Sequence, residues 1–310
     1  MLRITLLLFI LYCIPLIVGN NQAQAFFFVQ EEKESSEEAE TPTDEKKLPA
    51  KSMQRSDIKI VKPISIFEQQ KSDLTHYFAK DKVQKLTAGT NEYIMIEDVS
   101  ATENNKGVAI LLPDWQQGLA QSKAINTLRK NLPLHGWATM SIQSPNKPNG
   151  YPSSALINKE LIEQNAKALM LYQNELKSLI TAAMNKAKSY PGIILVISKG
   201  SQAAMLVNLY KNNPDLLPAA LVTLSAGMYS PIENELFAKN MATSALPILD
   251  LVLKRGNKLV LENALLRKKY ATKEMKVYYR QKHINTTALG HYPERTLLIE
   301  INGWLKTIGW

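Results

Sequence analysis

The stretch from Ile193 to Ala204 constrains the fold of this chain more than any other part of its sequence. It reads Ile-Ile-Leu-Val-Ile-Ser-Lys-Gly-Ser-Gln-Ala-Ala, so an apolar, mostly β-branched run stops at small and polar residues and helix-forming residues follow at once. A short continuous apolar run is typical of a strand that is buried on both faces. We therefore expect a strand, a tight turn at Gly200 and Ser201, and a helix.

Apolar runs and helical patterns alternate along most of the chain. The expected strands are 92–99, 107–113, 137–142, 193–197, 220–224, 246–253 and 275–279. The expected helices are 73–79, 122–135, 156–188, 203–211, 259–269 and 295–305. This alternation predicts an α/β fold with a mostly parallel central sheet and helices on both faces. Ligands of such sheets bind outside the carboxyl ends of the strands.

The N-terminal residues have the pattern of a secretory signal peptide. Arg3 precedes an uncharged apolar run over residues 4–18, and Ala23-Gln-Ala25 offers a cleavage site between small residues. The run is shorter than the ~20 residues of a membrane-spanning helix. We expect cleavage after Ala25, a periplasmic or secreted protein, and no transmembrane span in the mature chain; an uncleaved anchor is the alternative. Cys13, the only cysteine, lies in the apolar run, so a cleaved chain would have no disulfide and no catalytic thiol.

Charge is distributed unevenly along the chain. Residues 31–47 hold eight acidic and three basic residues, a net charge of −5, and show no apolar periodicity. They predict a disordered acidic linker over residues 26–57, followed by a single domain over residues 58–310. Because the whole chain carries +9 and Arg3 is the only charge before residue 31, residues 48–310 carry +13. A domain this basic is expected to attract anionic partners of the bacterial envelope. Its lysines are scattered, so no nucleic-acid binding is predicted.

Five segments resemble, in chain order, the motifs of the α/β-hydrolase superfamily. They are Leu111-Leu-Pro-Asp-Trp115, Leu134-His-Gly-Trp-Ala-Thr-Met-Ser141, Leu195–Ala204, Leu246-Pro-Ile-Leu-Asp250 and Ala288-Leu-Gly-His-Tyr292. Residues 73–310 are most similar to an uncharacterised branch of exported bacterial proteins with that fold. The resemblance implies an α/β-hydrolase-like sheet covered by helices on both faces. The stretch between Leu224 and Leu246 is too short for a large cap domain.

The resemblance also implies a triad in the chain order nucleophile, acid, histidine. Ser201 would be the nucleophile, His291 the general base, and Asp250, or alternatively Asp114, the carboxylate that orients the base. The backbone amides of Trp115 and Gln202 would bind the oxyanion. The histidines show no metal-ligand spacing and the glycines form no phosphate loop, so we expect no metal and no cofactor.

The turn itself leaves two registers open. The family places small residues two positions before and two positions after the nucleophile. With Gly200 at the nucleophile position, the second of these flanking residues is the large Gln202; with Ser201 there, the first is Lys199. In the Gly200 register the turn would be kept without a nucleophile, because glycine has no side chain and tolerates unusual backbone angles.

Two functions are therefore carried forward as hypotheses. The first is an exported serine esterase or acyl hydrolase that acts on ester-containing lipids or glycans of the envelope. The second is a non-catalytic binding or scaffold protein whose basic surface contacts anionic envelope partners. The fold alone does not decide between them, because function depends on the site that a fold carries.

Overall fold

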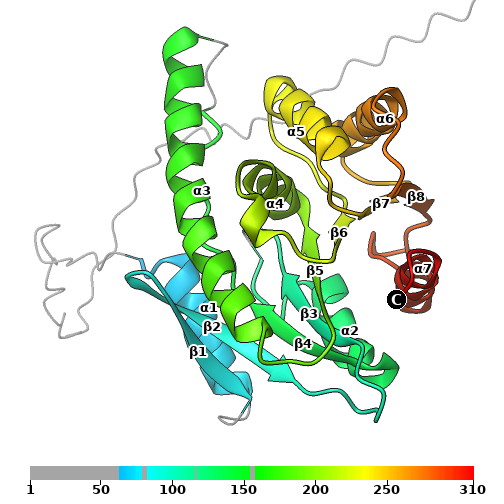
Figure 1. The fold of residues 1–310 in the computed structure, drawn as a ribbon. Coiled ribbons are helices and arrows are strands. Elements are labelled where there is room, and N and C mark those ends of the chain that lie inside the picture. The colour runs from blue at the N-terminus through cyan, green and yellow to red at the C-terminus, as the bar shows by residue number, and fades with distance from the viewer. Residues whose placement is uncertain (1–62, 79–81, 116, 154–157) are drawn as a thin grey trace, which may run out of the picture. The chain divides into compact units, whose positions relative to one another are not determined.

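The structure is a computed structural model that describes residues 63–78, 82–115, 117–153 and 158–310 (Figure 1). Residues Val61–Trp310 form one compact unit. The predicted signal peptide with its cleavage site and the predicted acidic linker lie outside the described residues. Within the described part of the chain, no helix combines the length and the apolar composition that a membrane span requires.

Eight strands of the described chain form one central sheet in the order β1-β2-β4-β3-β5-β6-β7-β8. The strands are β1 (Val83–Ala88), β2 (Asn91–Asp98), β3 (Gly107–Leu112), β4 (Trp137–Ile142), β5 (Ile193–Lys199), β6 (Ala220–Leu224), β7 (Ile248–Leu253) and β8 (Tyr279–Ile284). β2 is antiparallel to both of its neighbours, and all other neighbouring strands are parallel. The predicted mostly parallel sheet is confirmed.

Seven α-helices of the described residues accompany the sheet. They are α1 (Ile66–Tyr77), α2 (Lys123–Asn131), α3 (Lys159–Ala187), α4 (Gly200–Asn212), α5 (Pro231–Thr243), α6 (Lys258–Lys273) and α7 (Glu294–Thr307), with short 3-10 helices η2 (Leu132–His135) and η3 (Pro214–Leu216). Side chains of α3, α4 and α5 belong to the core on one face of the sheet, and side chains of α2 and α7 belong to the core on the other. The predicted α/β-hydrolase-like arrangement is confirmed, and the described residues contain no large cap.

The sequence patterns miss β1 and α5, and they misplace the last strand and α1, which was expected at 73–79 and lies at Ile66–Tyr77. β1 was not predicted, and the last strand lies at Tyr279–Ile284 rather than at 275–279. Both are edge strands whose side chains are mostly not buried, so no apolar run marks them. α5 was also missed, although its start carries a helix signal: Ser230 and Glu233 form a capping box around Pro231.

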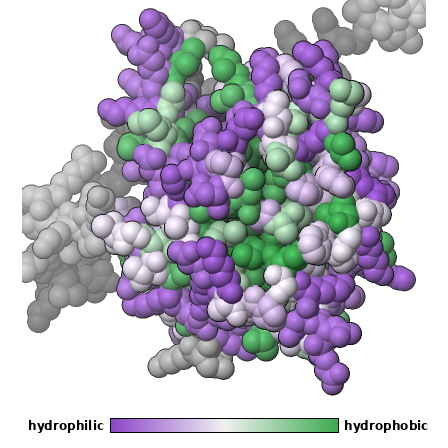
Figure 2. All heavy atoms as spheres, viewed as in Figure 1, coloured by the Kyte–Doolittle hydropathy of each residue, from purple (hydrophilic) through white to green (hydrophobic). Residues whose placement is uncertain are grey.

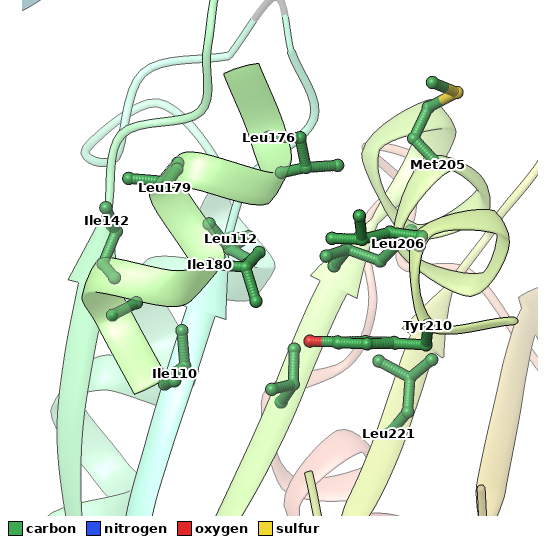
Figure 3. Close-up of a cluster of buried hydrophobic side chains, with 14 of the residues drawn as sticks. Ile110, Leu112, Ile142, Leu176, Leu179, Ile180, Met205, Leu206, Tyr210 and Leu221 are labelled. Carbon is green, nitrogen blue, oxygen red and sulfur yellow. The ribbon is translucent and has the colours of Figure 1, made fainter. Parts of the chain in front are cut away.

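The core follows from the two-residue period of the strands. In β3, every residue is buried: Val108, Ile110 and Leu112 face α3 and α4, whereas Ala109 and Leu111 face α2 and α7. Figure 3 shows α3 and α4 placing their apolar side chains over the same face of the sheet. This packing fixes the start of α4, and hence the turn after β5, relative to the loop after β3.

Candidate functional site

The turn after β5 adopts the Gly200 register. Gly200 has a φ of +61°, a left-handed conformation that glycine tolerates without strain, and it is the first residue of α4. A Cβ built on Gly200 would lie 2.8 Å from Oδ1 of Asp114 and closer still to its Oδ2 and Cγ. The turn therefore keeps the shape expected of a nucleophile position, and the carboxyl group of Asp114 fills the space into which a side chain would project.

Asp114 comes from the loop that follows β3, one strand away from the turn. Its Oδ1 accepts hydrogen bonds from the backbone N–H of Trp115 at 3.0 Å and from that of Ser201 at 3.1 Å. These amides come from the two places that build an oxyanion hole in hydrolases: the loop after the third strand and the residue after the nucleophile position. The N-terminus of a helix also favours a negative charge. Of the two predicted oxyanion amides, that of Trp115 thus binds a carboxylate of the protein itself, next to the amide of Ser201, which was not predicted; the backbone N–H of predicted Gln202 also acts on this carboxylate and lowers its pKa.

Opposing effects act on the pKa of the Asp114 carboxyl group. Burial raises the pKa of Asp114 above its ordinary value, against the lowering effects of the surrounding backbone N–H groups and of Lys199. Burial lowers the pKa of Lys199, and Asp114 opposes that change. The Lys199 Nζ donates to Oε1 of Gln117 at 3.0 Å. The lysine thus supplies positive charge near Asp114 without an ion pair among the described residues.

Ser201, the predicted nucleophile, is one residue past the left-handed position. Its side chain is buried, and its Oγ donates to the backbone carbonyl of Gly227 at 3.0 Å. Its backbone N–H donates a hydrogen bond to the Asp114 carboxyl group. The hydroxyl is therefore held against the loop after β6 by a hydrogen bond to a carbonyl, which cannot act as a base.

Asp250, the predicted acid, lies in the middle of β7 and is fully buried. Arg267 of α6 binds it through Nε at 2.8 Å and Nη2 at 3.1 Å. Its other donors are Thr223 Oγ1 at 2.9 Å, Tyr279 OH at 3.0 Å and Gln281 Nε2 at 2.9 Å. Burial acts to raise the pKa of Asp250, but Arg267, together with the donors Gln281 and Thr223, holds this pKa below its ordinary value. The carboxylate is thus saturated by structural partners.

His291, the predicted base, lies in the loop between β8 and α7 with an exposed side chain. Its backbone makes two hydrogen bonds with Thr287, whereas its imidazole has no hydrogen-bond partner among the described residues. The next residue, Tyr292, is the one that is buried: its OH donates to the carbonyl of Leu251 at 2.8 Å and lies 2.6 Å from Ser225 Oγ. The loop therefore delivers a tyrosine to the carboxyl edge of the sheet.

The structure does not join the predicted triad. Among the described residues, no hydrogen bond links Ser201, His291 and Asp250, and each has the separate environment given above. What it does bring together is Gly200, Asp114 and the amides of Trp115 and Ser201. The sequence pattern pointed to this pairing only through the position of Asp114 at the end of a buried strand.

An aromatic cluster packs around Trp115. Its ring lies 5.2 Å from the ring of Tyr172 and 5.7 Å from that of Tyr151, both edge-on, and it stacks on Tyr229 at 6.2 Å. The Tyr172 hydroxyl donates to the side chain of Gln202. Rings from four segments of the chain therefore pack together next to Asp114 in the loop after β3.

A separate hollow lies beside this cluster, and we call it the α3–α5 groove. It has a volume of about 850 Å³ and is lined by side chains of α3, α4, α5 and the loops before α3 and α5. Its apolar lining includes Ile162, Met170, Tyr229, Ile232 and Leu236, all exposed. Side-chain amides accompany them, at Asn158, Asn165, Gln173, Asn174, Asn208, Asn212, Asn213 and Asn240. Figure 2 shows apolar residues in the gap between α3 and α5 on the face seen in Figure 1.

Comparisons with solved structures find the same fold. Est1E from Butyrivibrio proteoclasticus is 9% identical with a TM-score of 0.54, covering 74% of this chain and 100% of its own. A dienelactone hydrolase from Anabaena variabilis is 11% identical with a TM-score of 0.51, covering 74% and 99%. An alpha-beta serine hydrolase homologue from Coxiella burnetii is 12% identical with a TM-score of 0.50, covering 75% and 100%. At these identities the likeness shows the α/β-hydrolase fold and nothing finer.

At the level of sequence, a family model described as "Protein of unknown function (DUF3530)" matches residues 8–307. No curated protein matches the chain.

Proposed function

Since the chain belongs to the DUF3530 family and has the fold of serine hydrolases, we propose that it is a non-catalytic α/β-hydrolase-like binding protein of the bacterial envelope. The observation that carries this proposal is the arrangement at the turn after β5. Gly200, at the nucleophile position, has no side chain that could attack a substrate, and the Asp114 carboxyl group fills the space that such a side chain would occupy. A side-chain nucleophile is the first requirement of covalent ester hydrolysis, and the oxyanion amides are its main source of transition-state stabilisation.

The other groups that a hydrolytic mechanism would need either bind other partners in the structure or lack the partner that they would need. The amides of Trp115 and Ser201 already bind an anion, so a substrate carbonyl would have to displace the Asp114 carboxylate. Asp250 neutralises the buried Arg267, and His291 is exposed with no acid to orient it among the described residues. These arrangements preserve the fold and support a role other than acyl transfer.

The α3–α5 groove is the surface that we assign to binding. Its size is in the range of ligand pockets in proteins, and its lining is apolar with scattered polar groups, as such pockets usually are. The amides supply neutral donors and acceptors, whereas Lys177 and Glu233 are its only charged lining residues. A ligand for this groove would therefore be largely uncharged and amphipathic. The N-terminal signal pattern supports an encounter with that ligand in the periplasm or outside the cell.

The alternative is the exported serine esterase, acting through Ser201 on esters of envelope lipids or glycans. It is favoured by the neighbours that are named as hydrolases. Reaction through Ser201 would require its Oγ to leave the Gly227 carbonyl and a base to reach it.

Labelling with a fluorophosphonate probe separates the two functions, because such probes react with activated serines. We expect no labelling of the folded wild-type protein under conditions that label an active serine hydrolase. The Ser201→Ala and His291→Ala variants serve as matched controls. Labelling of the wild-type chain that Ser201→Ala removes would overturn the proposal and establish a reactive serine.

A further inference from the structure

A second hollow lies between α7 and the segments that precede β3 and β4; we call it the basic pocket. It has a volume of about 490 Å³. Lys106 lies directly before β3 and His135 shortly before β4, so the pocket is at the amino edge of the sheet. Asp114 lies eight residues further along the chain, beyond the carboxyl end of β3, roughly 26 Å away at ~3.3 Å per residue of strand. The basic pocket is therefore distinct from the turn at Gly200.

The lining of the basic pocket is cationic. Lys106, His135, Arg295 and Lys306 supply half of its eight lining residues, and none of the eight is acidic. Nine ion pairs occur among the described residues, yet none of them includes Lys106, Arg295 or Lys306. Three cations with no partner in the described structure thus share one concave surface, where their fields add and attract an anion.

The carboxylates of α7 do not compensate this charge from within the pocket. Glu300 pairs with Lys282, and Glu294 accepts a hydrogen bond from Thr127 Oγ1 at 3.3 Å. Neither residue lines the pocket. The lining residues of α7 are three or four positions apart, as expected for one face of a helix, and the two glutamates flank that face without lining the pocket.

The remaining lining is suited to an organic anion. Leu298 and Ile299 provide apolar surface, and Asn302 adds a carboxamide whose buried Oδ1 has no hydrogen-bond partner within the described part of the chain. A carboxamide offers an oxygen acceptor or, turned by 180°, an NH₂ donor. Arg295 can bind two oxygens of one group through its planar guanidinium, which matches phosphate geometry, and lysines serve as point charges beside it.

We propose that the basic pocket binds a phosphate ester, with the phosphate oxygens on Lys106, Arg295 and Lys306 and the ester group on Leu298 and Ile299. The same chemistry is offered by a small organic phosphate in solution and by the headgroup of an anionic phospholipid. This site is independent of the proposed function, since it uses neither the Gly200 turn nor the α3–α5 groove.

Gly303 allows a sharp test of the pocket. It lines the cavity from the exposed face of α7, has an ordinary helical φ, and a Cβ built on it would meet no heavy atom within 4 Å. Gly303→Glu therefore places a carboxylate beside the cations, and Gly303→Gln places a neutral side chain of the same size there. Both substitutions replace a helical glycine with a better helix former, so both variants should fold.

A second pair of variants distinguishes binding in the pocket from non-specific attraction of anions by a basic chain. Lys306→Glu and Lys268→Glu change the net charge equally, but Lys268 lies exposed on α6 and does not line the pocket. Binding is measured by calorimetry with glycerol 3-phosphate and by co-sedimentation with phosphatidylcholine vesicles that contain or lack phosphatidylglycerol. Circular dichroism and melting temperatures check the fold of each variant.

We expect the wild-type chain, Gly303→Gln and Lys268→Glu to bind alike, and Gly303→Glu and Lys306→Glu to bind about tenfold more weakly, as one nearby opposed charge predicts. Binding of glycerol 3-phosphate identifies a soluble ligand, and binding of phosphatidylglycerol vesicles alone identifies a lipid headgroup. Equal weakening by Lys306→Glu and Lys268→Glu, equal behaviour of the two Gly303 variants, or no wild-type binding to either probe overturns the proposal.

Discussion

The carboxyl group of Asp114 lies where a side chain on Gly200 would project, and it binds the N–H groups of Trp115 and Ser201 that surround that position. The two residues are therefore interdependent. A carboxylate can occupy this place only because residue 200 has no Cβ, and the left-handed turn at Gly200 is unstrained only because it is glycine. The relationship explains how the turn after β5 keeps its left-handed conformation while a carboxyl group occupies the space beside it.

This interdependence is measurable as a coupling free energy. Gly200→Ala should destabilise the protein by about 1–2 kcal/mol for the left-handed backbone, and further because the new Cβ collides with the Asp114 carboxyl group. In an Asp114→Ala background only the backbone contribution should remain. Urea unfolding of the two single variants and the double variant should give a coupling of at least about 1 kcal/mol. Simple additivity of the two losses would contradict the steric relationship.

The Asp250–Arg267 pair is expected to dominate the stability of the β7–α6 region. Both side chains are fully buried, so Arg267→Met should leave an uncompensated carboxylate and lower the free energy of unfolding by about 3–5 kcal/mol. The exposed Lys268→Met on the same helix is the control and should change it by less than about 0.5 kcal/mol. If Arg267→Met were as mild as the control in chemical denaturation, the pair would not have the structural role assigned to it.

Lys276 should give the protein a rise in stability at alkaline pH. Burial lowers the pKa of Lys276 to about 8, with repulsion from Lys211 adding to the effect, whereas an unfolded lysine titrates at about 10.4. Between these values the unfolded chain binds more protons, so the free energy of unfolding increases with pH. Below the folded pKa the full cost of the buried charge is present.

Replacing Lys276 with methionine should remove this rise and stabilise the protein near neutral pH. Lys273→Met, at an exposed position of α6, should leave the slope unchanged. The measurement is the urea midpoint of each protein across the window from about 8 to about 10.4. A wild-type slope that Lys276→Met leaves intact would assign the effect to another group.

Neighbouring residues of the loop before α7 should respond to substitution in opposite ways. His291→Ala should leave the melting temperature unchanged, because the imidazole is exposed and has no hydrogen-bond partner among the described residues. Tyr292→Phe should cost about 0.5–1.5 kcal/mol, because it removes the hydroxyl that binds the Leu251 carbonyl and Ser225 Oγ, although that carbonyl keeps the N–H of Ser225 as a donor. Thermal unfolding of both variants checks this, and a larger loss for His291→Ala would indicate an inward-facing histidine.

The fold was predictable because its signals are local. The runs at 107–113, 193–197 and 220–224 form inner strands of the sheet and are mostly buried, so nearly all of their residues are apolar, with Thr223 as an exception, and the strands are easy to recognise. The edge strands β1 and β8 lack that signal because one side of each is open to solvent. The α5 helix was recognisable only from its capping box, since its apolar pattern is weak.

The site was less predictable because it depends on which side chains meet across the sheet. Ser201, Asp250 and His291 occur in the chain order of a hydrolase triad, but the order of residues along the chain does not determine where their side chains point. Asp250 was interpreted as an acid for a histidine, and the structure pairs it with Arg267 from a helix 17 residues further along the chain. A buried carboxylate is stabilised by a paired cation or by hydrogen-bond donors, and nothing in the local sequence around Asp250 identifies Arg267 as its partner.

The alternation of strands and helices, the turn after β5 and its two possible registers all follow from the amino-acid sequence, because hydrophobic periodicity and the position of a glycine are local properties of the chain. The choice between the two registers depends instead on contacts between distant residues. The parallel pairing of β3 and β5 brings Asp114 to the start of α4, and the backbone N–H groups there bind its carboxylate in the space that glycine leaves free. That contact joins residues far apart in the chain, so its energy arises only when the sheet has formed.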